Sequence, residues 1–344
     1  MHQENKINLS IVIPVYNEEK YLNKLFLDLK KYFNQEDVEV IVVNDGSDDD
    51  SINILEKFKN NFYKFQYKLI NLNKNFGKGY AVKQGAKKSI GEYILLQDAD
   101  LELDIKDSRE IYEIISSDES IDCIFGSRYL SGKLKKHSYF INEFIGKLNT
   151  FIFNLLFGQS LSDIHCGLKI FNRNVYQKIN LSVNDFGLEI DLASQIIKNN
   201  YFIYEVGVSY FSRTVKAGKK ITWLDGLKSY YYLFKVRFLD NTFSTLISII
   251  MSPIYMMYVG SYFGMGLGNT LFIIIFFLIG LIIGLHTKLI SSLSIFLFIY
   301  LGSLFGNGQG KVLSVLFFFI FGIYLVKKIR KIIFKNYPNF AHLF

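Results

Sequence analysis

Residues 91–102 read GEYILLQDADLE, and this stretch decides how the rest of the chain is interpreted. Four residues, Tyr93 to Leu96, form an apolar run that follows a glycine and ends abruptly at an acidic segment. Such a run is typical of a strand buried on both faces of a parallel sheet. Because ligands of open parallel sheets bind beyond the carboxyl ends of the strands, we expect the acidic segment to face a crevice.

Three carboxylates follow the predicted strand at alternate positions, Asp98, Asp100 and Glu102. In an extended segment such positions point to one side, so the three side chains would converge. A divalent cation that prefers oxygen ligands, Mg²⁺ or Mn²⁺, would relieve their repulsion and would itself hold a diphosphate. The segment therefore predicts a metal site, with a solvated acidic turn as the alternative.

Strands and helices alternate before this segment. Predicted strands cover residues 9–16, 38–43 and 67–71, and predicted helices cover residues 19–33, a stretch ending near 58, and 79–89. This alternation predicts an α/β fold with a parallel, doubly wound sheet. Beyond it we expect a strand at 122–125 and an apolar helix at 140–157, which either lines the approach of an acceptor or belongs to the core.

Polar residues stand where the first two predicted strands end. Tyr16, Asn17 and Glu18 follow Pro14, and Asp45 follows the second strand, so all would lie beside the same crevice. Asp45 could accept a hydrogen bond from the N–H of a nucleotide base. Turn chemistry with a helix N-cap is the alternative interpretation.

Two glycines flank a lysine at Gly77-Lys78-Gly79, just before a predicted helix. Glycine permits close backbone approach, a helix N-terminus attracts anions, and Lys78 adds positive charge. A second basic segment contains Arg213, Lys216 and Lys219 within a glycine-containing loop, which would suit a flexible clamp over a diphosphate. The alternatives are a flexible capping loop and a basic patch beside a membrane.

Eight segments, taken together and in order, resemble family-2 glycosyltransferases of the GT-A fold, in particular enzymes of the dolichyl-phosphate mannose synthase and bacterial polyprenyl-phosphate glycosyltransferase type. The segments are IVIPVYNEE at 11–19, VVNDGSDD at 42–49, NFGKGYAVKQG at 75–85, QDADLE at 97–102, GSRY at 126–129, SDIHCGLKIF at 162–171, FGLEIDLA at 186–193 and YFSRTVKAGKKITWLDG at 210–226. The resemblance implies a Rossmann-like nucleotide-sugar-binding domain. It departs from the family pattern at Asn44, where many relatives have Asp, and at Lys216, where an acidic residue is common.

The resemblance also implies roles for individual residues. Asp98, Asp100, Arg128 and Arg213 would be catalytic, the two arginines facing phosphate groups. The expected nucleotide-sugar contacts are Pro14, Tyr16, Asn17, Glu18, Asp45, Gly77, Lys78 and Asp98. The expected acceptor-side residues are Asp163, Glu189, Asp191 and Lys219, and the expected metal ligands are Asp98, Asp100 and Glu102. His165 is left out, because a single histidine without a spaced partner is more often structural.

Charges nearly vanish between about residue 243 and Lys327, as expected of membrane-embedded sequence. Apolar stretches at 245–263, 270–285, 289–305 and 312–326 predict four spans, or two spans with re-entrant or interfacial helices. An aromatic helix at 223–238 would lie on the membrane surface. We therefore expect a GT-A domain at 1–221, an interfacial region at 222–242, transmembrane helices at 243–328 and a basic tail at 329–344.

The net charge and the first residues of the sequence indicate where the protein is located in the cell. The formal charge is +8, with basic residues clustered near the predicted membrane region and at 327–331, so we expect contact with anionic lipids and none with nucleic acid. The first ten residues lack the apolar run of a signal peptide, which favours a cytoplasmic catalytic domain on an integral membrane protein. Cys123 and Cys166 form no CxxC pair and are expected to be reduced thiols; a homo-oligomer is possible.

These observations predict transfer of a sugar from a nucleotide diphosphate donor to a polyprenyl phosphate, dolichyl or undecaprenyl, for synthesis of cell-surface glycans or glycoconjugates. The acceptor phosphate is largely ionised near neutral pH, so it needs no strong base. The resemblance implies inversion at the anomeric carbon. One alternative is transfer to a hydroxyl of a lipid-linked or growing saccharide, for which Asp163, Glu189 or Asp191 would serve as general base. Another is a non-catalytic membrane scaffold.

Overall fold

The computed structural model describes residues 6–59, 63–130, 132–136, 140–213 and 223–239, and beyond them 250–254, 256–257, 275, 278–279, 317, 319–324 and 328. The chain divides into two compact units, Met1–Leu233 and Phe234–Phe344. No helix within the described ranges combines the length and the apolar character that a membrane crossing requires. Most of the four predicted spans, the basic tail and Lys219 lie outside the described residues.

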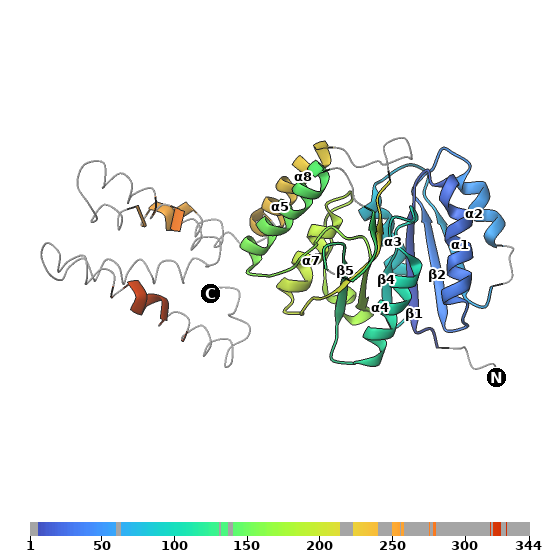
Figure 1. The fold of residues 1–344 in the computed structure, drawn as a ribbon, viewed down its shortest axis with the longest axis horizontal. Helices are drawn as coiled ribbons and strands as arrows, with labels where there is room; N and C mark the ends of the chain where they lie inside the picture. The colour runs from blue at the N-terminus through green and yellow to red at the C-terminus, as the bar shows by residue number, and fades with distance from the viewer. Residues whose placement is uncertain are drawn as a thin grey trace, which may run out of the picture. The chain divides into compact units, whose positions relative to one another are not determined.

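The first unit is built on a seven-stranded sheet with the order β3-β2-β1-β4-β7-β5-β8 (Figure 1). Its strands are β1 (Leu9–Val15), β2 (Val38–Asn44), β3 (Gln66–Asn71), β4 (Tyr93–Leu96), β5 (Cys123–Ser127), β7 (Lys169–Asn172) and β8 (Tyr204–Gly207). A second, two-stranded sheet pairs β6 (Lys135–Lys136) with β9 (Tyr210–Phe211). The α/β fold is therefore confirmed.

The prediction of a wholly parallel sheet is wrong at β7, which runs antiparallel to both of its neighbours. Lys169, its first residue, pairs with Leu96 at the end of β4 and with Phe125 near the end of β5. A parallel strand would need a connection that returns to the opposite edge of the sheet. The chain between β5 and β7 instead comes back at the edge where β5 ends, so the next strand runs the other way.

Eight α-helices accompany the strands in the described part of the first unit and at its boundary. They are α1 (Glu19–Phe33), α2 (Ser51–Lys59), α3 (Lys78–Lys88), α4 (Ile105–Ser117), α5 (Phe140–Phe157), α6 (Arg173–Lys178), α7 (Leu188–Lys198) and α8 (Trp223–Phe234), which a π-helical turn, Lys235–Leu239, extends. The bounds of α1 and α5 agree with the predicted 19–33 and 140–157. Helix α4, which we did not predict, begins after Asp104, whose side chain caps it by accepting a hydrogen bond from Lys106 N.

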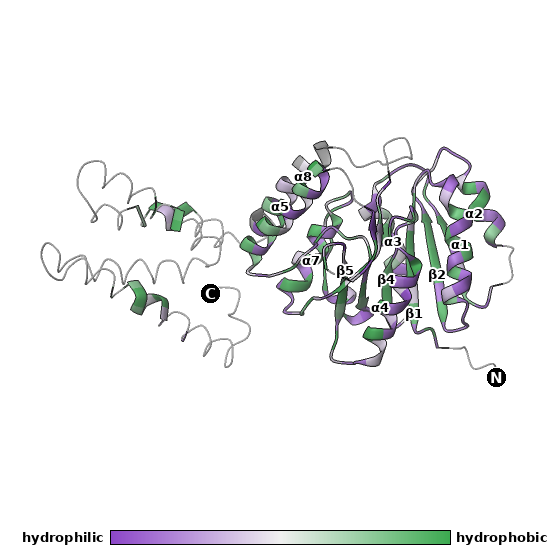
Figure 2. Cartoon of the chain, in the orientation of Figure 1, coloured by the Kyte–Doolittle hydropathy of each residue, from purple (hydrophilic) through white to green (hydrophobic). Residues whose placement is uncertain are grey.

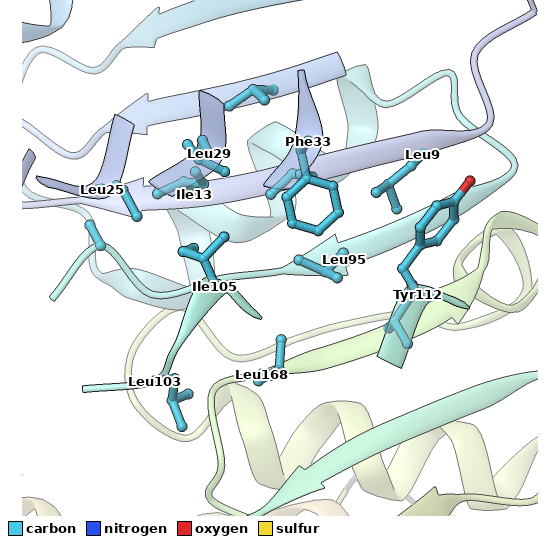
Figure 3. Packing of buried hydrophobic residues seen from close by; sticks show 14 of the residues in the cluster. Leu9, Ile13, Leu25, Leu29, Phe33, Leu95, Leu103, Ile105, Tyr112 and Leu168 are labelled. Carbon is cyan, nitrogen blue, oxygen red and sulfur yellow. The ribbon is translucent and has the colours of Figure 1, made fainter. Parts of the chain in front are cut away.

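The core lies on both faces of the sheet because β1 and β2 are apolar on both sides, as Figure 2 shows for β2. On one face, alternate residues of β1, β2 and β4 pack against the apolar stripes of α1 and α4 (Figure 3). On the other face Ile41 and Val43 pack with Ala81 of α3. This arrangement places the carboxyl ends of β1, β2 and β4 at one open edge, where their polar continuations meet.

Candidate functional site

A cavity of about 430 Å³ lies at this edge of the sheet. The predicted site residues that line it are Pro14, Tyr16, Glu18, Asp45, Gly77, Lys78, Asp98, Asp100, Glu102, Arg128, Glu189 and Arg213. They come from positions spread over about 200 residues of sequence, so the tertiary fold brings together most of the residues that the sequence singled out. Asn17, Asp163 and Asp191 do not line the cavity.

The three predicted metal ligands all border the cavity, although the backbone that carries them differs from the extended segment we expected. The backbone after β4 is a turn rather than an extended segment, and Leu101 has φ of 57°, in the left-handed region. Glu102 N donates a hydrogen bond to Asp100 Oδ1 at 3.0 Å across this turn. The left-handed residue reverses the chain, so Asp98, Asp100 and Glu102 still border one cavity.

The Arg213 guanidinium lies among the carboxylates of this cluster. Nη2 is 2.7 Å from Asp100 Oδ2 and Nη1 is 3.0 Å from Glu18 Oε2. The Arg213 backbone N–H also donates to Glu102 Oε1 at 2.8 Å. Although burial opposes its charge, these carboxylates raise the pKa of Arg213, so the guanidinium remains ionised.

Lys78 forms the second cationic centre. Its Nζ lies 2.7 Å from Asp98 Oδ1 and 2.8 Å from Glu189 Oε1, and these carboxylates raise the pKa of Lys78 against the effect of burial. Gly167 packs directly on Asp98, because a Cβ at Gly167 would overlap the Asp98 carboxylate. The lysine thus ties the end of β4 to the start of α7.

Two cations of the chain therefore supply the charge that we assigned to a metal. In the described ranges no group of three or more His, Cys, Asp or Glu side chains is arranged as a metal site. Burial, and next the charge of Asp98, raise the pKa of Asp100 to about 7 against the opposing effect of Arg213. Carboxylate oxygens suit Mg²⁺ or Mn²⁺, so Asp98, Asp100 and Glu102 fit such an ion if it displaces the two protein cations. Metal binding remains a prediction.

Asp45 holds the glycine loop at the start of α3. Its two carboxylate oxygens accept hydrogen bonds of 2.8 Å from the backbone N–H groups of Phe76 and Gly77. Gly77 has φ of 98°, and a Cβ there would lie 2.5 Å from Asn184 O, so no other residue fits this loop. Burial raises the pKa of Asp45 despite these two bonds. Asp45 lines the cavity and keeps lone pairs for a base N–H.

Arg128 reaches the cavity while paired with Asp163. Its Nε and Nη2 donate to the two Asp163 oxygens at 2.7 and 2.8 Å, a bidentate pair. Asp163 is fully buried, and although burial opposes ionisation, Arg128 holds the pKa of Asp163 below its ordinary value. The structure thus places Asp163 behind Arg128 as its counter-ion.

Two other predicted residues make contacts within the fold. Asp191 is fully buried, and its Oδ2 accepts hydrogen bonds from Ser182 N at 2.6 Å and Val183 N at 2.9 Å. Asn17 exchanges hydrogen bonds with Asp48, so it joins the end of β1 to the turn after β2. These contacts hold loops that border the site.

Several cavity residues were not predicted. They include Asn149 of α5, His165, Gly167, Tyr129 and Tyr210. A glycine directly before a short strand was the available signal for Gly167, since it marks close approach of another group. No local pattern could have identified Asn149, whose place in the cavity depends on how α5 packs.

Comparison with known proteins agrees with this geometry. Residues 10–179 match the sequence model of Glycosyl transferase family 2. The chain is 29% identical over 220 residues to a dolichyl-phosphate beta-glucosyltransferase of Dictyostelium discoideum, covering 60% of this chain and 67% of the relative. It is 31% identical over 173 residues to an undecaprenyl-phosphate 4-deoxy-4-formamido-L-arabinose transferase of Proteus mirabilis, covering 49% and 51%. The chain thus spans between half and two thirds of these relatives.

Solved structures share the fold. Glucosyl-3-phosphoglycerate synthase from Mycobacterium tuberculosis, in complex with phosphoglyceric acid, aligns with a TM-score of 0.53 at 15% identity, covering 67% of this chain and 80% of that one. A structure of the same enzyme with Mn²⁺, uridine diphosphate and glucosyl-3-phosphoglycerate aligns with a TM-score of 0.52 over the same shares. At this identity the likeness supports the GT-A-like α/β fold with its mixed sheet.

Proposed function

Residues 10–179 form a domain of glycosyl transferase family 2, and from this premise we propose that the protein transfers a hexose from a nucleotide diphosphate donor to a polyprenyl phosphate. The observation that carries the proposal is the cavity itself, where two cations and an acidic cluster meet at the carboxyl edge of the sheet. The two relatives described above are named as a dolichyl-phosphate and an undecaprenyl-phosphate transferase. Glucose is the first candidate sugar, because several relatives are named as glucosyltransferases.

The charges of the cavity suit departure of a diphosphate. Arg213 and Lys78 both line it and both remain protonated. Preorganised positive charge stabilises the negative charge that develops on a leaving group. Asp98, Asp100 and Glu102 would hold Mg²⁺ or Mn²⁺, which when bound supplies further positive charge to the diphosphate oxygens. Arg128, fixed by Asp163, is placed to contact a second phosphate, that of the acceptor.

Each candidate general base of the alternative reaction is engaged through at least one carboxylate oxygen, and neither Asp163 nor Asp191 lines the cavity. Glu189 binds Lys78, Asp163 binds Arg128, and Asp191 accepts two backbone N–H groups. Arg128 holds the pKa of Asp163 below its ordinary value, which makes this carboxylate a weaker base. This supports a phosphate acceptor, which is ionised without a protein base, over a hydroxyl acceptor.

Features of helix α5 favour a lipid acceptor. Residues Asn142, Ile145, Gly146 and Asn149 line the cavity. Five large apolar side chains of the same helix are exposed, Phe140, Ile141, Phe144, Phe151 and Leu155. An exposed apolar patch marks a surface for a membrane, a ligand or another protein. We assign it to the lipid surface, from which a polyprenyl phosphate would enter the cavity beside α5.

The proposal is tested with membranes that contain the protein. These are incubated with UDP-glucose or other nucleotide sugars, with a polyprenyl phosphate or a lipid-linked saccharide as acceptor, and the lipids are identified by mass spectrometry. We expect a polyprenyl phosphate hexose, formed by the wild type and not by an Asp100→Asn variant of equal abundance. Product only on a hydroxyl acceptor would reject the proposed acceptor, and no product from any donor would reject the activity.

A further inference from the structure

His165 lies at the cavity edge because β7 runs antiparallel. Its position, just before β7, brings it beside the carboxyl end of β4. Residues that line the cavity follow the strand order β2, β1, β4, β7 and β5: Asp45, Tyr16, Asp98, His165 and Arg128. Neighbouring strands are about 4.8 Å apart. The site residues thus form a row along the sheet edge.

A nucleotide sugar has the same linear order, with the base first, then the ribose, the diphosphate and the sugar. A base beside Asp45 and a diphosphate at the acidic cluster after β4 would carry the hexose one strand further, to the start of β7. His165 and Gly167 occupy that place, with Glu189 on the adjoining α7. The acceptor phosphate would then lie beyond the hexose, near Arg128.

Asn149 of α5 fixes the orientation of the imidazole. Its Nδ2 lies 3.3 Å from His165 Nε2, and Asn149 is 2% exposed. Its Oδ1 is buried without a hydrogen-bond partner among the described residues. Buried unsatisfied polar atoms are rare, and departures of this kind gather at functional sites. The contact with His165 explains why a polar residue, Asn149, is buried at this position of α5.

The imidazole is neutral in this environment. Burial lowers the pKa of His165 to about 4, against the attraction of Glu189 and Asp163. A neutral imidazole has one N–H donor and one acceptor nitrogen, so the nitrogen that does not face Asn149 can form a hydrogen bond with a hydroxyl group in either tautomer. A neutral imidazole can form a hydrogen bond with an uncharged hydroxyl group. The cationic side chains Lys78 and Arg213 would bind the phosphate groups.

We propose that His165, positioned by Asn149, binds a hydroxyl group of the donor hexose and thereby contributes to the choice of sugar. This inference rests on the proposed function. His165 contacts the substrate, whereas Asn149 acts through His165 as a positioning residue. The proposal rests on the order of the strand ends along the cavity, on the contact between Asn149 and His165, and on the position of both residues in the cavity wall.

The test measures kcat/KM for UDP-glucose and for its 2-, 3-, 4- and 6-deoxy analogues, in membranes with polyprenyl phosphate. With the wild type, the analogue that lacks the contacted hydroxyl should lose about tenfold or more, the loss of one hydrogen bond. His165→Ala should lower kcat/KM for UDP-glucose by a similar factor. This variant should then use UDP-glucose and the analogue that lacks the contacted hydroxyl almost equally well. His165→Gln should retain part of the discrimination, because an amide can still donate a hydrogen bond.

Positioning is tested in the same series. Asn149→Leu should flatten discrimination at the same hydroxyl with His165 intact, while the affinity for UDP, which has no hexose, stays within about twofold. Asn174→Ala, an exposed residue of α6 outside the cavity, is the control and should keep the wild-type profile. An unchanged deoxy-sugar profile in the His165 variants would overturn the inference. No lipid product from the wild type with any donor would instead overturn the proposed function.

Discussion

At the scale of single residues, the site depends on how carboxylates are neutralised. Arg213 and Lys78 bind the side chains that we assigned to a metal. A divalent cation therefore has to exchange with protein cations, which links metal binding to release of Arg213. Asp100 is central, because its carboxylate faces Arg213 and lies beside Asp98 and Glu102.

The pKa of Asp100 predicts how metal binding varies with pH. A metal needs the ionised carboxylate, so protons compete with it. The pKa is raised to about 7, and affinity for Mn²⁺ should therefore weaken as pH falls through this value, by about tenfold from pH 8 to pH 6. Electron paramagnetic resonance of free Mn²⁺ measures the affinity. Asp118→Asn, at an exposed site, should keep this dependence; equal affinity at both pH values would contradict the assignment of Asp100 as a ligand.

Gly167 is required by the close approach of Asp98. A Cβ at this position would overlap the Asp98 carboxylate and displace it. Misplacement of a reacting group by about 1 Å can reduce the rate about 10²-fold, so Gly167→Ala should lower kcat/KM by that order. The control is Gly158→Ala, which strains the backbone at a φ of 63° but has no atom within 4 Å of the added Cβ and does not line the cavity, so kcat/KM should stay near the wild-type value. Wild-type turnover in Gly167→Ala would show that Asp98 need not keep its place.

At the scale of elements, the Arg128–Asp163 pair joins the end of β5 to the segment that leads into β7. Ser162 and Asp163 backbone N–H groups also donate to Glu205 of β8, at 2.8 to 3.1 Å. The segment is thus held by ionic and backbone contacts from two strands. Its position matters because His165 and Gly167 follow directly.

Removing one partner of this pair should destabilise the fold. Asp163→Asn leaves a buried guanidinium without its counter-ion, which costs about 3–5 kcal/mol in the free energy of unfolding. Replacing both, with Arg128→Met and Asp163→Leu, should restore most of the stability because no charge is left buried. Urea or thermal unfolding measures the stability of both variants. Product formation measures the turnover of the double variant. A folded double variant with full turnover would show that Arg128 contacts no phosphate in the reaction.

Helix α5 has one side in the cavity and another with exposed aromatic residues. Phe144→Ser with Phe151→Ser should raise KM for polyprenyl phosphate by about tenfold or more, because full burial of one aromatic side chain contributes about 1.5–3 kcal/mol and about 1.4 kcal/mol corresponds to a factor of ten. UDP affinity should not change. Phe202→Ser, at a residue 80% exposed outside α5, is the control. An unchanged KM would remove α5 from the path of the lipid.

At the scale of the whole molecule, the chain consists of two compact units. The described residues that line the cavity all belong to Met1–Leu233. The predicted membrane region belongs to Phe234–Phe344, and most of it lies outside the described residues. Donor binding and membrane attachment should therefore separate at this boundary.

A chain of residues 1–233 tests this separation. It should bind UDP in the presence of Mn²⁺ with an affinity within about twofold of the full chain, because the described residues that line the cavity lie in the first unit. Transfer to a polyprenyl phosphate in vesicles should fall strongly, since the acceptor is confined to the membrane. Calorimetry and lipid analysis provide the two readouts. Loss of UDP binding by a truncated chain with native circular dichroism would assign part of the donor site to the second unit.

Much of the local structure followed from the sequence. The apolar stripe of α1 recurs at helical spacing, and its predicted bounds agree with Glu19–Phe33. The strands β1, β2 and β4 were found from short apolar runs, and their polar ends identified several of the cavity residues. These features could be predicted because side-chain periodicity, glycine loops and the ends of strands depend on neighbours in the chain.

The tertiary structure alone decided the direction of β7, the partners of the cations and the place of His165. Arg213 meets Asp100 across 113 residues, and Lys78 meets Glu189 across 111. Sequence spacing indicates that carboxylates need neutralising, but which cation reaches them depends on how distant loops pack. In the same way, the place of Asn149 became visible only in the fold, because long-range packing determines which side chains share a cavity. Helix α4 was missed although its N-cap Asp104 and its apolar spacing are local signals.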